Sequence, residues 1–187
     1  PIELLMRRGE DQQSLIDTLR SVGAGDADIP LAETVIPGVV ALLGLDEGTH
    51  FSDLSESSIT NMRLTPALAR TGALARLRQT VSDLEIKGSG GRFRISYPSN
   101  PDLTASFMLI TDSWLSAQAL AGDPVFAAGS RVLLHVCGSD DTEALAGLRE
   151  IAATYYSNSV GDPSANGRPL TPKLLTVRNG ALTEFDG

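Results

Sequence analysis

Two short runs of alternating residues, joined by four small residues, constrain the fold of this chain more than any other feature. Apolar and polar side chains alternate through residues 84–87 and again through residues 92–97, and the link between them is Gly88-Ser89-Gly90-Gly91. Alternation with a period of two predicts a β-hairpin that has one apolar face and one polar face. The segment therefore favours a sheet-containing fold in which this hairpin covers part of the core.

The same pattern predicts the register of the hairpin. We expect Lys87 to pair with Arg92, which places Glu85 opposite Arg94. All apolar side chains then lie on one face and all ionic side chains on the other. In this register, cross-strand pairing with Glu85 is the expected way in which the arginines near the hairpin tip are neutralised.

The first half of the chain predicts helices flanking a buried strand. Apolar residues at helical spacing predict a helix over residues 10–22 whose buried face is made by Leu15, Ile16, Leu19 and Val22. The apolar run of residues 31–45 predicts one buried strand. Thr65-Pro66 indicates the start of another helix, because threonine caps the first turn and proline suits its first position.

The second half predicts further strands alternating with helices. The expected elements are a strand over 104–110, a helix from Asp112 to Gly122, strands over 125–127 and 131–137, a helix capped by Asp140 that runs through Tyr156, and a hairpin around Asn179-Gly180. Together the elements predict an α+β fold, with a largely antiparallel sheet and three to four helices packed mainly on one face. We expect a single domain over residues 1–187, with an N-terminal helix (1–23), a core (31–185) and a long polar loop (157–172).

Composition restricts the class of partner. The 187 residues carry a formal charge of −8, which disfavours nucleic acid and permits a basic protein partner. The sequence has no apolar run long enough to span a bilayer and no secretory pattern at its start, so we expect no membrane partner. A lone cysteine, Cys137, cannot form an internal disulfide and suits a reducing compartment. These features predict a cytoplasmic protein.

Reactive side chains are few, and none forms a catalytic or metal-binding motif. His135 and Cys137 are two apart in a predicted strand, so both point to one face, as a base and its nucleophile would. Packing is the alternative interpretation, because a free cysteine is normally a small buried residue. We expect neither a metal site nor a cofactor.

Two further segments are candidates for binding. Arg76 and Arg78 precede the hairpin and Arg92 lies at its tip, so these three arginines could bind a small anion. The glycine link itself does not resemble a phosphate-binding loop, because it leads into a strand and not into a helix. In the loop of residues 157–172, the polar side chains of Asp162, Asn166 and Arg168 are candidates for contact with a partner, and mobility is the alternative.

The chain resembles the YtpQ-like family of uncharacterised bacterial proteins over about residues 31–185. The resemblance rests on Leu31, Asp46, Gly48, Phe51, Glu56, Leu64-Thr65, Ala73-Leu74, Ala105-Ser106, Asp112, Trp114, Gly122-Asp123, the strands 125–127 and 131–136, Leu170-Thr171-Pro172 and Asn179-Gly180. Arg76 replaces a common asparagine of that family, and residues 127–131 lack its proline and aspartate. The resemblance implies a shared fold and brings no established activity.

These observations favour a non-catalytic function. We expect a bacterial module that binds another protein, and an inhibitor or immunity-type protein that neutralises a toxin or enzyme is one form of it. The alternative is a small hydrolase or transferase whose site is assembled by the fold around His135 and Cys137.

Overall fold

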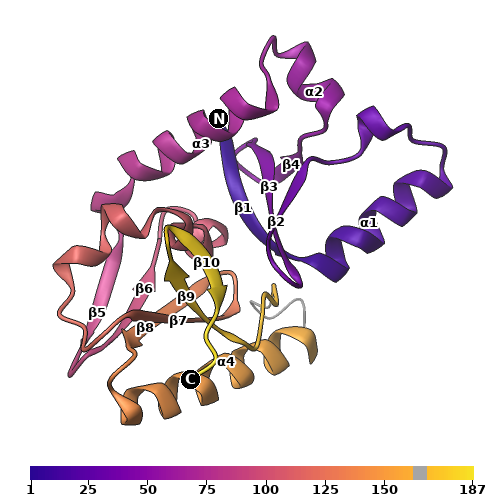
Figure 1. Ribbon diagram of the computed structural model, residues 1–187. Helices are drawn as coiled ribbons and strands as arrows, with labels where there is room; N and C mark the ends of the chain where they lie inside the picture. Colours follow the sequence, from indigo (N-terminus) through magenta and orange to yellow (C-terminus); the bar gives the residue numbers. More distant parts are fainter. Residues whose placement is uncertain (162–167) are drawn as a thin grey trace. The chain divides into compact units, whose positions relative to one another are not determined.

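The computed structural model describes residues 1–161 and 168–187, and it divides the chain into two compact units. Residues 1–79 form the first unit and residues 80–187 form the second, each with its own antiparallel sheet (Figure 1). The predicted α+β class and the antiparallel pairing are confirmed. Two sheets take the place of the one sheet that we expected.

The sheet of the first unit is built around one long strand. In chain order the unit contains β1 (Ile2–Arg8), α1 (Gly9–Ser21), η1 (Asp26–Asp28), β2 (Ala32–Ile36), β3 (Val39–Asp46), β4 (Phe51–Asp53), α2 (Glu56–Asn61) and α3 (Pro66–Gln79), where η denotes a 3₁₀-helix. Strand β3 pairs with β1 on one side and with β2 and β4 on the other, and all of these pairs are antiparallel. Most of its side chains are buried, so β3 forms the centre of this core.

The single strand predicted over residues 31–45 is wrong, because the segment folds back on itself. Strands β2 and β3 form a hairpin whose turn contains Pro37 and Gly38. Gly38 has a φ of 85°, a conformation that glycine adopts without the steric cost of a Cβ atom. An apolar run has no period that would reveal such a turn. Strand β1, which the sequence pattern does not predict, pairs with β3 along its whole length.

The two longer helices of this unit begin near their predicted positions, and each buries few side chains. The hydroxyl of Thr65 accepts a hydrogen bond from the Leu68 amide, so the predicted start of α3 is confirmed. Leu68 itself is 61% exposed, and the buried side chains of α3 are those of Ala69, Ala73 and Leu77. In α1 the predicted apolar face is at best half-buried, and Val22 just beyond the helix is 79% exposed.

The second unit has a six-stranded sheet in the order β10-β9-β7-β8-β6-β5. Its elements are η2 (Val81–Asp83), β5 (Glu85–Ser89), β6 (Arg92–Ser96), η3 (Pro101–Ser113), η4 (Leu115–Ala117), β7 (Pro124–Ser130), β8 (Leu133–Gly138), α4 (Thr142–Gly161), β9 (Leu174–Arg178) and β10 (Ala181–Glu184). The predicted hairpin at Asn179-Gly180 is confirmed, and both of these residues have positive φ, as a two-residue hairpin turn requires.

The β5–β6 hairpin forms as predicted, but its register differs by two residues. The turn is Gly90-Gly91, so Lys87 pairs with Arg94 and Ser89 with Arg92. The predicted pairing of Lys87 with Arg92 is therefore wrong. Because the shift is an even number of residues, each side chain keeps the face that the alternation predicts. Glu85 faces Ser96 and lies opposite no arginine.

The strand predicted over residues 104–110 and the helix predicted from Asp112 to Gly122 are both wrong. Two 3₁₀ segments joined at Ile110 make up η3, and a short turn, η4, follows. The indole nitrogen of Trp114 donates a hydrogen bond of 2.9 Å to the Phe107 carbonyl oxygen, and the Ala105 amide donates to the Arg131 carbonyl oxygen. These tertiary bonds satisfy the backbone of a buried apolar segment that has no clear period of its own.

Helix α4 begins one residue later and ends five residues later than predicted. Asp141 caps it by accepting a hydrogen bond of 2.9 Å from the Ala144 amide, so the capping role predicted for Asp140 is wrong. Its C-terminal end takes residues 157–161 out of the loop predicted over 157–172.

Packing between α4 and the sheet forms the core cluster on one face of the second unit. Leu145, Leu148 and Ala152 of the helix pack with Val125, Ala127, Cys137 and Leu174 of the strands. Gly129 of β7 lies so close to the helix that a Cβ atom there would be 2.4 Å from the Ala152 carbonyl oxygen and 2.8 Å from the Tyr156 nitrogen. The close approach of helix and sheet therefore requires glycine at this position.

We expect Gly129→Ala to destabilise the second unit by about 1–3 kcal/mol, the usual cost of overpacking a close contact. Trp114 is the only tryptophan in the chain and lies in this unit, so its fluorescence during urea unfolding measures the change. Gly161→Ala at the end of α4 is the control, because a Cβ atom there meets nothing within 4 Å. Equal stability of the two variants would contradict the close approach.

Candidate functional site

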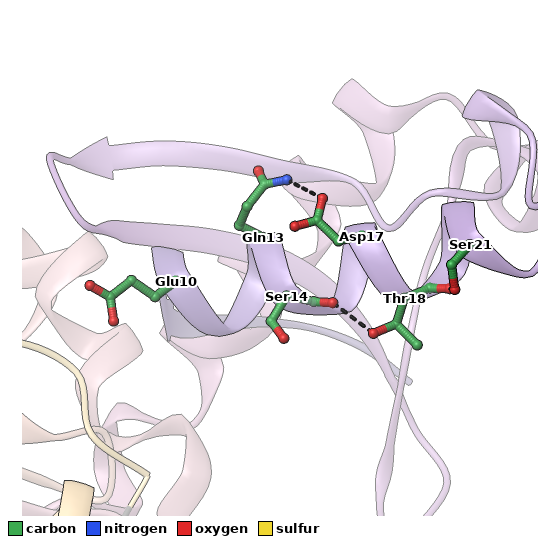
Figure 2. A pocket seen from close by; sticks show the side chains of 6 residues that line it. All are labelled: Glu10, Gln13, Ser14, Asp17, Thr18 and Ser21. Carbon is green, nitrogen blue, oxygen red and sulfur yellow. Dashed lines mark hydrogen bonds between the residues drawn. The ribbon is translucent and has the colours of Figure 1, made fainter.

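Helix α1 has a polar face that is open along its length. Figure 2 shows the six side chains that line a shallow depression of about 550 Å³ on this face: Glu10, Gln13, Ser14, Asp17, Thr18 and Ser21. The Gln13 amide donates to Asp17 over 2.8 Å, and the Thr18 hydroxyl donates to the Ser14 carbonyl oxygen over 2.8 Å. The face thus presents two carboxylates and several hydroxyl groups to solvent.

The other face of α1 carries apolar side chains that its own unit does not fully cover. Leu15, Ile16 and Leu19 are half-buried, and Val22 is 79% exposed. Gly23 follows the helix with a φ of 91°, and this turn leaves Val22 at the surface. The helix therefore has apolar and acidic surface within reach of a partner.

A polar network ties the start of α1 to the sheet of the first unit. Gln12 is the one buried side chain of the helix, and its carbonyl oxygen accepts a hydrogen bond of 3.3 Å from Arg7 of β1. Arg7 also forms a two-bond ion pair with Asp53 of β4, at 2.6 and 3.0 Å. The Gln12 amide nitrogen has no hydrogen-bond partner within the part of the chain that the structure describes. Polar contacts, more than apolar packing, hold the first turn in place.

Arg76 and Arg78, two of the predicted anion-binding residues, lie near the end of α3. Arg76 forms an ion pair with Glu3, which is buried on β1. Burial raises the pKa of Glu3, while the hydrogen bond from Arg76 opposes the shift. Arg92, the third predicted residue, belongs to the second unit, so the three-arginine site stays a prediction.

His135 and Cys137 lie side by side on the face of the second sheet that α4 covers. Cys137 is fully buried in the apolar cluster, and burial raises its pKa to about 11. Burial also lowers the pKa of His135 to about 4, with a further contribution from the charges of Arg94 and Arg92. At neutral pH the thiol is protonated, whereas a nucleophilic cysteine acts as the thiolate. The pair is thus suited to packing, with the His135 ring 6.0 Å from the Tyr155 ring.

The predicted partner-binding residues are only partly covered by the structure. Asp162 and Asn166 lie outside the described residues. Arg168 is exposed and forms an ion pair with Asp102 of η3, which also accepts a hydrogen bond of 3.1 Å from the buried Arg131. One carboxylate thus holds two guanidinium groups at the end of η3, and this arrangement fixes Arg168 in place.

No helix within residues 1–161 and 168–187 is long and apolar enough to cross a membrane. The same described residues contain no group of three or more histidine, cysteine, aspartate or glutamate side chains that could hold a metal ion.

Comparisons with protein-family models, with curated proteins and with solved structures found no match to this chain. The resemblance to the YtpQ-like family therefore stays a prediction.

We expect Cys137 to be unreactive toward a thiol reagent such as Ellman's reagent in the folded protein and fully reactive in denaturant, because it is buried and protonated. Ser157→Cys provides the control, since Ser157 is exposed on α4 and a thiol there should react in the folded state. Rapid labelling of Cys137 in the native wild type would show that the thiol is accessible.

The lowered pKa of His135 predicts a pH dependence of stability. The unfolded state binds more protons than the folded state between pH 6.5 and about 4, so the second unit loses stability as the pH falls through this range. We expect the decrease in the free energy of unfolding over this pH range to be about 1–3 kcal/mol smaller in His135→Gln than in wild type. Urea unfolding followed through Trp114 fluorescence measures the difference. His50→Gln, an exposed histidine of the other unit, should leave the profile unchanged. Identical pH profiles for wild type and His135→Gln would refute the assignment.

Proposed function

We propose that this protein is a non-catalytic module that binds another protein, and that α1 provides the contact surface. The observation that carries the proposal is that α1, a helix of 13 residues, buries only Gln12 against its own unit. Short helices are marginal in water, and most helical stability in proteins comes from packing an apolar face. A helix with so little internal packing gains stability when a partner covers it.

The chemistry of α1 indicates the kind of partner. The exposed Val22 just beyond the helix offers an apolar anchor, and Glu10 and Asp17 offer negative charge along the polar face. Buried aromatic or aliphatic anchors supply most of the affinity of an interface, while charges at its edge mainly raise the association rate. We infer a partner that offers an apolar contact to Val22 and basic residues to the polar face of α1.

An inhibitor or immunity-type role is the specific form of this proposal. Enzymes and toxins that act on polyanions carry basic surfaces, and an acidic helix complements such a surface. The formal charge of −8 of the chain is consistent with this form. The buried, protonated Cys137 does not support the alternative of a small hydrolase or transferase, because such a site requires an accessible nucleophile.

Affinity capture from lysate of the native cells, with matched variants, tests the proposal. We expect wild type to retain a near-stoichiometric protein and the double variant Val22→Ser, Asp17→Asn to retain it about 5–30-fold less well, as loss of an anchor costs about 1–2 kcal/mol. Both side chains are exposed, so these substitutions should leave the fold unchanged.

The control is the double variant Val160→Ser, Glu56→Gln, which replaces an exposed valine and an exposed glutamate outside α1. It should capture the partner as well as wild type does. Equal capture by both double variants would exclude α1 as the contact surface, and an empty capture with wild type would contradict the binding function. For the immunity-type form, the purified chain should abolish the activity of the captured enzyme or toxin.

A further inference from the structure

The second unit carries three like charges side by side on its sheet. Lys87 of β5 pairs with Arg94 of β6, and Arg94 pairs in turn with His135 of β8. Arg92 is two residues from Arg94 on the same strand, so its side chain points to the same face. Directly opposed like charges destabilise a sheet, so this arrangement has a cost that an anion would remove.

None of the carboxylates in the described residues forms an ion pair with Arg92 or Arg94. Glu85, the expected partner, faces Ser96 and instead binds Lys87 over 2.6 Å. Within residues 1–161 and 168–187, neither Arg92 nor Arg94 forms an ion pair or a side-chain hydrogen bond. The Lys87–Glu85 pair is exposed on both sides and contributes little, so Lys87 can reorient toward a ligand.

This part of the sheet face is open to solvent. Helix α4 packs over β7, β8 and β9, and it leaves Lys87, Arg92 and Arg94 exposed. Arg92 approaches the helix at Gly147, where a Cβ atom would lie 2.5 Å from a guanidinium nitrogen. The small residue on the helix thus leaves room for the arginine. A lysine on the edge strand β5 can be explained as protection against edge-to-edge aggregation. This explanation does not apply to Arg94, because β6 is an inner strand.

We propose that Lys87, Arg92 and Arg94 bind a phosphate or pyrophosphate group of a small molecule on the open face of β5 and β6. A guanidinium group offers paired donors that match phosphate oxygens, and the lysine adds a third cation at the next strand. Three cations on adjacent positions of two strands suit a compact dianion better than a single carboxylate.

The flanking residues restrict the ligand to a small one. Asp141 and Glu143 line a depression of about 230 Å³ between the hairpin tip and the first turn of α4, together with Ser89, Gly90, Arg92 and Ala144. With Glu85 on the other side, these carboxylates confine the positive surface to three side chains. A long polyanion such as a nucleic acid needs an extended basic stripe and would meet these carboxylates.

The aromatic pair beside the cations gives the site a reporter. The rings of His135 and Tyr155 lie 6.0 Å apart, Tyr155 is 40% exposed, and His135 pairs with Arg94. The charges of Arg94 and Arg92 contribute to the lowered pKa of His135. An anion bound to the arginines should therefore raise that pKa and shift the His135 ring signals in an NMR titration.

Binding of sodium pyrophosphate and sodium phosphate to the full chain tests the proposal, with sodium chloride at equal ionic strength as the reference. We expect both phosphates to raise Tm beyond the chloride value and to shift the signals of His135. The double variant Arg92→Gln, Arg94→Gln should bind pyrophosphate about tenfold more weakly or worse. Arg178→Gln is the matched control, since Arg178 is an exposed strand arginine of the same sheet.

Each outcome separates the proposal from its alternatives. Equal affinity of wild type and the double variant, or an effect no larger than that of chloride, would overturn it. Tighter binding of a single-stranded oligonucleotide than of pyrophosphate would overturn it in favour of a polyanion surface. Without phosphate, Arg94→Gln should have a Tm at least as high as wild type, because it removes a like-charge contact. A lower Tm would assign Arg94 to fold stability and overturn the proposal.

Discussion

The second unit depends on the packing of α4 against β7 and β8. The glycine at position 129 lets the helix approach the sheet closely, and the apolar cluster beneath it excludes water from Cys137. Because one helix cannot cover six strands, the same packing leaves the outer hairpin open on this face. A buried apolar region and a solvent-exposed charged region are thus adjacent on one sheet, and the boundary between them lies near His135.

The first unit separates core and surface in a different way. Its stability centres on β3, which is hydrogen-bonded on both edges and buried along most of its length. Helix α1 adds little to that core and is held mainly by the polar contacts of Gln12, Arg7 and Asp53. Polar contacts at the first turn fix where a helix begins, but they do not require the remaining side chains of the helix to pack against the unit. The remaining side chains of α1 are therefore available for recognition.

Local chemistry predicts the element boundaries well where one or two residues determine the backbone. Asn179-Gly180 and Thr65-Pro66 act through their own conformational preferences, and the structure confirms both. Sequence-based prediction of an element is wrong where contacts with residues far away in the chain determine the backbone conformation. The segment 101–113 takes its 3₁₀ form from bonds to other parts of the fold, and the hairpin over 32–46 contains a turn that its apolar pattern conceals. The same distinction applies to the candidate sites. The sequence pattern identifies Arg92 but pairs Arg94 with Glu85. Alternation determines the face that a side chain occupies, but it cannot distinguish registers that differ by an even number of residues.

The position of the Gly90-Gly91 turn determines which charged residues pair across the hairpin. A shift of the register by two residues changes which charges meet across β5 and β6, and every apolar side chain stays on its own side of the sheet. The electrostatic character of the open face can therefore vary in steps without repacking the core.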